Sequence, residues 1–313
     1  MEDAVEMSDG SNVLIVGSVA LDNVKTPFGE VNEALGGAAV YSSVAASYFA
    51  PVRIVGVVGN DFADEHVGFL KSRGIDVAGL QSVSGETFRW SGYYDFNLNQ
   101  AHTLETKLNV FQDFRPHIPP QYQESDYVFL ANIDPALQLQ VLDQVKSPKL
   151  TVCDTMNYWI DTRRDLLIEV LKRVDVVFLN DAEARQLCGT FSLVKAANDI
   201  RKLGPSVVII KKGEHGAVMV SDDAFFAAPS YPLEEVRDPT GAGDSFAGGF
   251  IGYVASTDDI SEANLRKATI FGSTLASFNV QDFSLGRLST LTQQDIVDRY
   301  CEFRRIAHFE PVE

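Results

Sequence analysis

Six short apolar runs constrain the fold of this chain more strongly than any other feature of its sequence. Each run is rich in β-branched residues and is bounded by glycine or polar residues. Runs of this length that lack polar alternation are typical of strands buried on both faces of a parallel sheet. They lie at residues 13–16, 53–58, 127–130, 150–152, 174–179 and 207–210.

Amphipathic stretches of helix length separate several of these runs. They lie at residues 37–50, 64–72, 135–145, 164–174, 181–187 and 192–203. Strands that alternate with helices along a chain indicate a parallel sheet covered by helices on both faces. We therefore predict an α/β fold whose central sheet is mostly parallel and is flanked by helices.

Two stretches, about 19–35 and 86–113, interrupt this rhythm. Both are richer in Thr, Asn, Gln and aromatic residues, and residues 88–96 partly alternate between polar and apolar. This pattern is typical of exposed antiparallel strands. Because no linker or repeat divides the chain, we predict one domain over residues 1–313, with a small β-sheet lid formed by the two stretches. Such a lid can cover one site or pair with the lid of a second subunit, so a homodimer is left open.

The charge balance restricts the partners of the protein. Its 26 Lys and Arg residues face 43 Asp and Glu residues, which gives a net charge of −17. Binding to nucleic acid through a basic face is therefore not expected, whereas a few local groups can still hold a small anion. The three cysteines show neither disulfide nor metal-binding spacing, which predicts a reducing, cytoplasmic location. No apolar segment is long enough to indicate a membrane span.

The most informative segment is RDPTGAGDSFAGGF, residues 237–250. Gly241 and Gly243 predict a tight loop at the N-terminus of an apolar, small-residue helix. Unpaired amides and the positive end of the helix dipole allow such a loop to cradle an anion. Asp244 either caps this helix or takes a proton from an attacking hydroxyl while the amides stabilise a transferring phosphoryl group. The local pattern leaves both interpretations open.

Residues 238–246, DPTGAGDSF, closely resemble the C-terminal signature of the ribokinase-like, or PfkB, family of carbohydrate and nucleoside kinases. Weaker matches follow the order of the family's motifs between about residues 13 and 286. They are GSVALD at 17–22, GGAA at 36–39, VVGND at 57–61, NDAE at 180–183 and KKGEHGA at 211–217. The resemblance thus covers nearly the whole chain.

The resemblance implies transfer of the γ-phosphoryl group of Mg-ATP to a hydroxymethyl group. It makes Asp244 the general base, and it makes the amides of Gly241, Ala242 and Gly243 the anion hole. The implied ATP-binding residues are Asn180, Glu183, Lys211, Gly213, Gly216 and Thr240.

The same resemblance assigns the ions. Glu183 would organise Mg²⁺ mainly through water, since a hydrated hard cation needs few direct protein ligands. Asp238 and Thr240 match positions that bind a monovalent cation in some members, so activation by K⁺ is a further expectation to test.

On the acceptor side, the resemblance points to Asp22, Gly36 and Gly37. A carboxylate can accept hydrogen bonds from two adjacent hydroxyl groups, and glycines allow close approach of the backbone. Tyr41 and Asn157 are also candidates for substrate binding, but both lie at departures from the pattern. Tyr41 replaces an asparagine that is usual in sugar kinases, and it can form a hydrogen bond, stack on a ring or fill core volume. The arginine expected two residues after Asn157 is missing.

These features favour an ATP-dependent kinase of an unphosphorylated sugar, because Arg89 and Lys107 are too few to indicate a phosphosugar clamp. A nucleoside kinase is the alternative within the same chemistry. A catalytically silent sugar or nucleotide sensor is the alternative from another class, and the intact GAGD segment disfavours it. The lid aromatics can pack against a sugar, a nucleobase, each other or a second subunit. These aromatics are Trp90, Tyr93, Tyr94 and Phe96.

Overall fold

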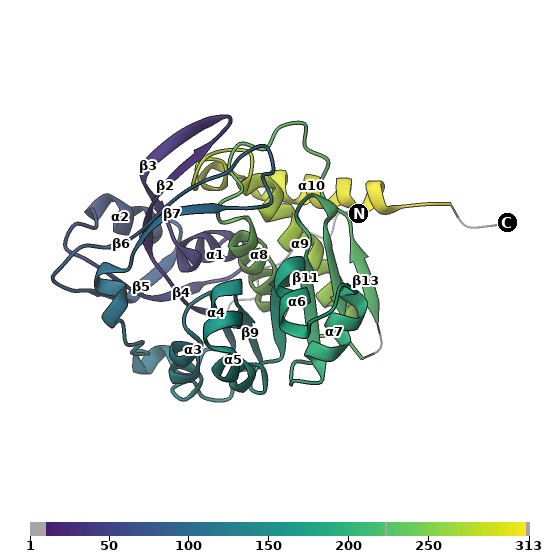
Figure 1. Ribbon diagram of the computed structural model, residues 1–313, viewed down its shortest axis with the longest axis horizontal. Coiled ribbons are helices and arrows are strands. Elements are labelled where there is room, and N and C mark those ends of the chain that lie inside the picture. Colours follow the sequence, from purple (N-terminus) through teal and green to yellow (C-terminus); the bar gives the residue numbers. More distant parts are fainter. Residues whose placement is uncertain (1–10, 223, 311–313) are drawn as a thin grey trace.

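The computed structural model describes residues 11–222 and 224–310, which form two sheets and their flanking helices (Figure 1). Within these residues the larger sheet has nine strands, in the order β13-β12-β11-β10-β9-β8-β1-β4-β5. The strands are β1 (Val13–Val16), β4 (Val52–Val58), β5 (Ile75–Ser82), β8 (Tyr127–Leu130), β9 (Leu150–Asp154), β10 (Val176–Asn180), β11 (Val207–Lys211), β12 (Ala217–Val220) and β13 (Phe225–Ala228). All neighbours pair in parallel except β11 with β12 and β12 with β13. The predicted mostly parallel α/β sheet is confirmed.

Burial on both faces explains why the predicted strands lack polar alternation. In β1, Val13 and Ile15 belong to the apolar cluster on one face of the sheet, whereas Leu14 and Val16 belong to the cluster on the other face. All four are fully buried. Strands β5 and β13 are edge strands with exposed polar or aromatic residues, so they carry no comparable apolar run.

Helices cover both faces of the large sheet (Figure 1). Buried residues of α1 (Ala38–Ala46), α8 (Ala242–Thr257) and α9 (Glu262–Asn279) join the first cluster, together with part of α2 (Asp64–Ser72) and α10 (Gln293–Ala307). The second cluster includes α3 (Pro135–Leu142), α5 (Arg164–Leu171), α6 (Asp181–Cys188) and α7 (Leu193–Arg201), and Ile160 of the short helix α4 (Asn157–Thr162). None of the described helices has the length and hydropathy of a membrane-spanning segment.

The smaller sheet, which we call the lid, lies above one end of the large sheet (Figure 1). Its order is β3-β2-β6-β7, with β2 (Ala20–Thr26), β3 (Gly29–Gly36), β6 (Phe88–Tyr93) and β7 (His102–Lys107). Each of the two predicted segments forms an antiparallel pair, but β2 and β6 join the segments in parallel. The expectation of antiparallel strands therefore holds within each segment and is wrong at the junction, because pairing between distant segments depends on where the core delivers them.

Candidate active site

Polar side chains gather at the carboxyl ends of three neighbouring parallel strands. Asp154, Asn180 and Lys211 are the last residues of β9, β10 and β11, so they share one edge of the sheet. Helix α8 begins above this edge, since Phe246 in its second turn packs edge-on against Phe178 of β10 at 5.6 Å between ring centroids. Such edges are where open α/β sheets bind ligands.

The loop before α8 requires glycine at its first turn. Gly241 is the N-cap of the helix and has a left-handed backbone, with φ of 76°. A Cβ at this position would also overlap the aromatic ring of Tyr41. Tyr41 is 1 % exposed, so of its three predicted uses the structure shows the packing one, as a floor beneath the loop.

The backbone amides of this loop are not equivalent. The amide of Ala242 donates to the carbonyl of Pro239 at 3.1 Å. The amides of Gly241 and Gly243 donate to no carbonyl among the described residues. Of the three amides assigned to the anion hole, these two are therefore the ones that are free to donate hydrogen bonds to an anion.

Asp238 stabilises the same loop through hydrogen bonds from backbone amides. Its carboxylate accepts the amide of Thr240 at 2.9 Å and the amide of Ser284 at 3.2 Å, and the residue is fully buried. Burial raises the pKa of Asp238, and these hydrogen bonds oppose the rise. Both carboxylate oxygens thus already accept hydrogen bonds from backbone amides. The side chain of Asn279 holds the loop as well, since it donates to the carbonyl of Thr240 at 2.7 Å.

Asp244 is the third residue of α8 and does not cap it, because Gly241 holds the N-cap position without a side-chain hydrogen bond. Asp244 is half-buried, and burial raises the pKa of its carboxyl group to about 7. The nearby carboxylate of Asp154 raises it further, and the ammonium of Lys211 lowers it. A group with a pKa near neutrality is well matched to general-base work. The structure thus excludes Asp244 as the N-cap of α8, and its role as a base stays a prediction.

Asn180 and Glu183 form a capping box at the start of α6. The side chain of Asn180 accepts the amide of Glu183 at 2.8 Å, and the carboxylate of Glu183 accepts from the backbone and the side-chain amide of Asn180, each at 2.7 Å. Glu183 is 6 % exposed, and burial together with Asp154 raises its pKa to about 8 while Lys211 lowers it. A local capping motif thus holds a buried carboxylate beside the strand ends.

The turn after β11 is shaped by two glycines with positive φ. Gly213 has φ of 55° and Gly216 has φ of 75°, and a Cβ at Gly216 would collide with the carbonyl of Ala228. A Cβ at Gly213 would collide with the side-chain oxygen of Asn99, which lies in the loop between β6 and β7. The lid loop therefore reaches the turn that the family resemblance assigns to ATP.

Asp22, Gly36 and Gly37 meet where the lid joins the core. The carboxylate of Asp22 lies directly against the Cα of Gly36, and Gly37 has φ of 93° and no room for a Cβ beside the carbonyl of Ser18. Burial raises the pKa of Asp22 to about 7, the amide of Gly37 lowers it, and the carboxylates of Asp238 and Asp244 raise it. This electrostatic coupling places Asp22 in the neighbourhood of Asp244.

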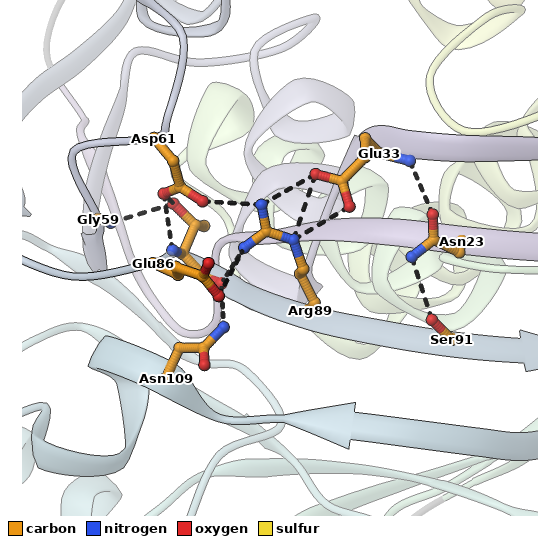
Figure 2. Close-up of polar contacts among 9 residues, drawn as sticks. Asn23, Glu33, Gly59, Asp61, Glu86, Arg89, Ser91 and Asn109 are labelled. Carbon is orange, nitrogen blue, oxygen red and sulfur yellow. Dashed lines mark hydrogen bonds and ion pairs between the residues drawn. The ribbon is translucent and has the colours of Figure 1, made fainter.

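Two predicted features lie apart from this group. Asn157 is an exposed residue of α4 whose side chain donates to Gln186 on α6 at 2.9 Å, so its contacts are with that helix and not with the Asp22 region. Arg89 lies at the base of the lid, where its guanidinium contacts Glu33 at 3.0 Å and Asp61 at 2.8 Å (Figure 2). Arg89 is therefore engaged by acidic side chains and is not free to hold a phosphosugar.

The structure brings Tyr94 and Asp154 into the site beside the residues assigned by the resemblance. Tyr94, in the lid loop, accepts a long hydrogen bond of 3.4 Å from the hydroxyl of Thr240. Burial raises the pKa of Tyr94 to about 12, the Thr240 hydrogen bond lowers it, and nearby carboxylates raise it. Asp154 forms an ion pair of 2.7 Å with Lys211. Asp154 is placed by its position at the end of β9, whereas the place of Tyr94 depends on the path of the lid loop.

No group of three His, Cys, Asp or Glu side chains in the described parts of the chain is arranged to hold a metal ion. Glu183 presents a buried carboxylate whose oxygens already accept two hydrogen bonds from Asn180. Such a carboxylate fits contact with a hydrated Mg²⁺ held mainly by nucleotide phosphates.

Known proteins resemble this chain along most of its length. The family model described as pfkB family carbohydrate kinase matches residues 12–291. A cytidine kinase of Thermococcus kodakarensis is 34 % identical over 248 residues, which cover 77 % of this chain and 88 % of the relative.

Solved structures share the fold. A nucleoside kinase of Methanocaldococcus jannaschii, described as an archaeal member of the ribokinase family, superposes with a TM-score of 0.75 at 22 % identity, covering 94 % of this chain and 99 % of that chain. An aminoimidazole riboside kinase of Salmonella enterica, complexed with aminoimidazole riboside and an ATP analog, superposes with a TM-score of 0.74 at 18 % identity. The match covers 93 % of this chain and 100 % of that chain.

Proposed function

Because the chain belongs to the PfkB family of carbohydrate kinases and is thus a phosphotransferase, we propose that it transfers the γ-phosphoryl group of ATP to the hydroxymethyl group of a nucleoside. The observation that carries the chemistry is Asp244, which has a pKa of about 7 and lies in the first turn of α8, directly after the free amides of Gly241 and Gly243. A silent sensor has no use for a base in this position.

The reaction assigned to these residues is an in-line displacement. Asp244 accepts the proton of the acceptor hydroxyl, whose oxygen forms a bond to the γ-phosphorus. The bond between that phosphorus and the β,γ-bridging oxygen breaks, and ADP leaves. The amides of Gly241 and Gly243, the α8 dipole and the Lys211 ammonium stabilise negative charge at the transferring group.

Magnesium would enter this scheme with the nucleotide. Glu183 is the residue that would hold it, through bound water, and the ion would neutralise charge on the phosphate oxygens. The protein itself supplies positive field from the loop amides, the α8 dipole and Lys211, so a chain with a net charge of −17 can still bind a polyphosphate.

The choice of a nucleoside over a free sugar reverses the preference drawn from sequence patterns, and Trp90 supports it from the structure. Asp22 on β2 pairs in register with Trp90 on β6. Residues paired across neighbouring strands project from the same face of a sheet, so Trp90 and Asp22 share one face of the lid. On that face the indole covers Gly92 and donates to the hydroxyl of Thr103 on β7 at 3.2 Å. A half-buried aromatic ring one strand away from a diol-binding carboxylate offers a stacking surface for a base.

The cytidine kinase relative supports the same choice, because it is 34 % identical over most of its length. A screen that measures ADP release with nucleosides, pentoses and hexoses as acceptors tests the proposal directly. We expect turnover with at least one nucleoside and little with any free sugar. A clear preference for a free sugar would contradict the nucleoside assignment, and no ADP release with any acceptor would contradict the kinase itself. Running each assay with and without K⁺ tests the cation expectation for Asp238 and Thr240.

Replacing Trp90 by leucine tests how the acceptor is held. We expect the KM for the preferred nucleoside to rise about tenfold or more, since stacking of a base on an aromatic ring contributes about 1–3 kcal/mol, while the KM for ATP changes little. The matched control is Tyr93→Leu, because Tyr93 follows on the same strand, is exposed and projects from the opposite face. Equal effects of the two changes would indicate a loss of lid structure and count against stacking.

A further inference from the structure

The ion pair between Asp154 and Lys211 spans an intervening strand. Lys211 ends β11 and is paired with Asn180 of β10, whereas Asp154 ends β9. The lysine side chain therefore crosses β10, where its Nζ lies 5.8 Å from the centre of the Phe178 ring, and reaches the Oδ2 atom of Asp154 at 2.7 Å. A long, flexible side chain is thus fixed at both ends.

The same ammonium lies at the anion hole. A Cβ built on Gly243 would be 3.0 Å from the Nζ of Lys211, so the charge sits beside one of the two free loop amides. The Nζ has three hydrogens, and its hydrogen bond among the described side chains goes to Asp154. Two hydrogens are left for an anion at Gly243.

Asp154 is itself held firmly in place. It is 4 % exposed, its Oδ1 atom accepts the amide of Thr155 at 2.8 Å, and its carbonyl accepts the side-chain amide of Gln138 at 3.0 Å. Its Oδ2 atom is the one directed at Lys211. Resting on the proposed kinase function, we infer that Asp154 is a positioning residue, which holds the Lys211 ammonium beside Gly243 so that it meets the transferring phosphoryl group.

The pair also sets the electrostatic surroundings of the base. The charged and titratable groups that face Asp244 are Asp22 on β2, Tyr41 on α1, Tyr94 in the lid loop, Asp154 on β9 and Lys211 on β11. Of these, Asp154 raises and Lys211 lowers the pKa of Asp244. The two members of the ion pair therefore act on the base with opposite signs.

Lysine 211 stays charged in this site. Burial disfavours its charge, but the carboxylates of Asp154 and Glu183 outweigh burial and raise the pKa of Lys211. The ammonium is thus a permanent positive charge at neutral pH, which is what a phosphoryl-binding group requires.

Three variants separate position from charge. Asp154→Ala removes the anchor, and we expect kcat/KM for ATP to fall about tenfold, the size expected for one hydrogen bond to a charged group. Asp154→Asn keeps an acceptor oxygen without the charge, so most of kcat/KM should survive while the acid limb of the pH profile moves to lower pH. Lys211→Gln should move that limb to higher pH. We expect each movement to be about half to one pH unit.

Opposite movements of the acid limb cannot arise from a merely structural role. Asp199→Asn on α7, which weakens two partly exposed ion pairs, with Lys195 and with Lys202, is the control that should leave the limb in place. The inference is overturned if the acid limb moves in the same direction in Asp154→Asn and Lys211→Gln. It is also overturned if the limb moves in neither variant. If Asp154→Ala does not fold, these two variants decide the outcome by themselves.

A binding measurement separates this inference from the proposed function. Calorimetric titration with Mg²⁺ and a non-hydrolysable ATP analogue needs no acceptor and no turnover. We expect Asp154→Ala to weaken binding about tenfold and Asp154→Asn to weaken it much less. Wild-type affinity in the alanine variant would overturn the inference even if nucleoside phosphorylation is observed. A tenfold loss would support it even if the acceptor is a different compound.

Discussion

The floor of the site and the lid above it are held in place by different kinds of interaction. The floor is core: Tyr41 beneath Gly241, and Phe246 against Phe178, are buried side chains. The lid is anchored by Leu21 and Leu35, which join the first core cluster, but its base also depends on partly exposed polar contacts. Among these, Arg89 has a side-chain exposure of 19 %, and its ion pairs are drawn in Figure 2.

A single arginine organises the base of the lid. Arg89 on β6 bridges Glu33 on β3 and Asp61 in the loop after β4, and Asp61 in turn accepts the amide and the hydroxyl of Thr87, each at 2.7 Å. Burial opposes the charge on Asp61, yet the Thr87 hydrogen bonds and Arg89 lower its pKa. Partly exposed pairs contribute at most about 1 kcal/mol each, so they hold a lid that can still open.

The comparison teaches that the two regions should fail in different ways when they are changed. Changes in the floor should affect kcat or folding, because they disturb buried chemistry. Changes at the lid base should affect the KM for the acceptor, because they alter how often the lid is closed.

The largest effect is expected at Asp244. Asp244→Asn should lower kcat about a thousandfold, since general bases contribute roughly 10²–10⁴, while the affinity for the ATP analogue should change little because the loop amides are intact. Steady-state kinetics measures the fall in kcat, and calorimetric titration measures the affinity for the ATP analogue. Turnover near the wild-type level would remove Asp244 from the role of base.

Glycine 241 should be the next most sensitive position. Gly241→Ala places a Cβ in a left-handed backbone and against the Tyr41 ring, so we expect kcat to fall about a hundredfold and the melting temperature to decrease. Gly68→Ala is the control, because Gly68 lies within α2 with open space around it and alanine favours helices. Equal changes in kcat and melting temperature in Gly241→Ala and Gly68→Ala would contradict this role of the floor.

The buried carboxylates make the stability of the floor dependent on pH. The pKa values of Asp22 and Asp244 rise to about 7 and that of Glu183 to about 8 in the folded protein, above their ordinary values near 4. At pH values between the ordinary and the raised pKa values, the folded chain binds more protons than the unfolded chain. Its free energy of unfolding must therefore fall as pH rises.

We therefore expect the ligand-free protein to be less stable at pH 8 than at pH 6, by on the order of 5 kcal/mol. Denaturant unfolding at the two pH values measures the difference. Asp22→Asn should reduce it, because the neutral side chain no longer titrates. Stability that increases from pH 6 to pH 8 would show that these carboxylates are ionised at little cost in the folded state.

The smallest effect is expected at the lid base. Arg89→Gln should raise the KM for the acceptor about fivefold and leave kcat nearly unchanged, in line with the modest contribution of partly exposed ion pairs. The control is Arg173→Gln, which breaks the exposed pair with Asp143 between α3 and α5, away from the lid. A fall in kcat with an unchanged KM would place Arg89 in the machinery of the floor.

The sequence alone determined the features that rest on local pattern. Apolar runs such as 127–130 identified buried strands, because burial on both faces removes polar alternation. Residues 241–244 identified a helix N-terminus suited to an anion, because glycine spacing and an apolar helix suffice for that inference. The two lid segments were also recognisable, since exposed strands differ in composition from buried ones.

Only the tertiary structure decided which of these features meet. The parallel junction of β2 with β6 sets Trp90 beside Asp22, and β9 and β11 bring Asp154 and Lys211 together across β10. Tertiary packing also placed Tyr41 under Gly241. These outcomes depend on strand order and on the path of loops between distant segments, which short-range sequence patterns do not encode.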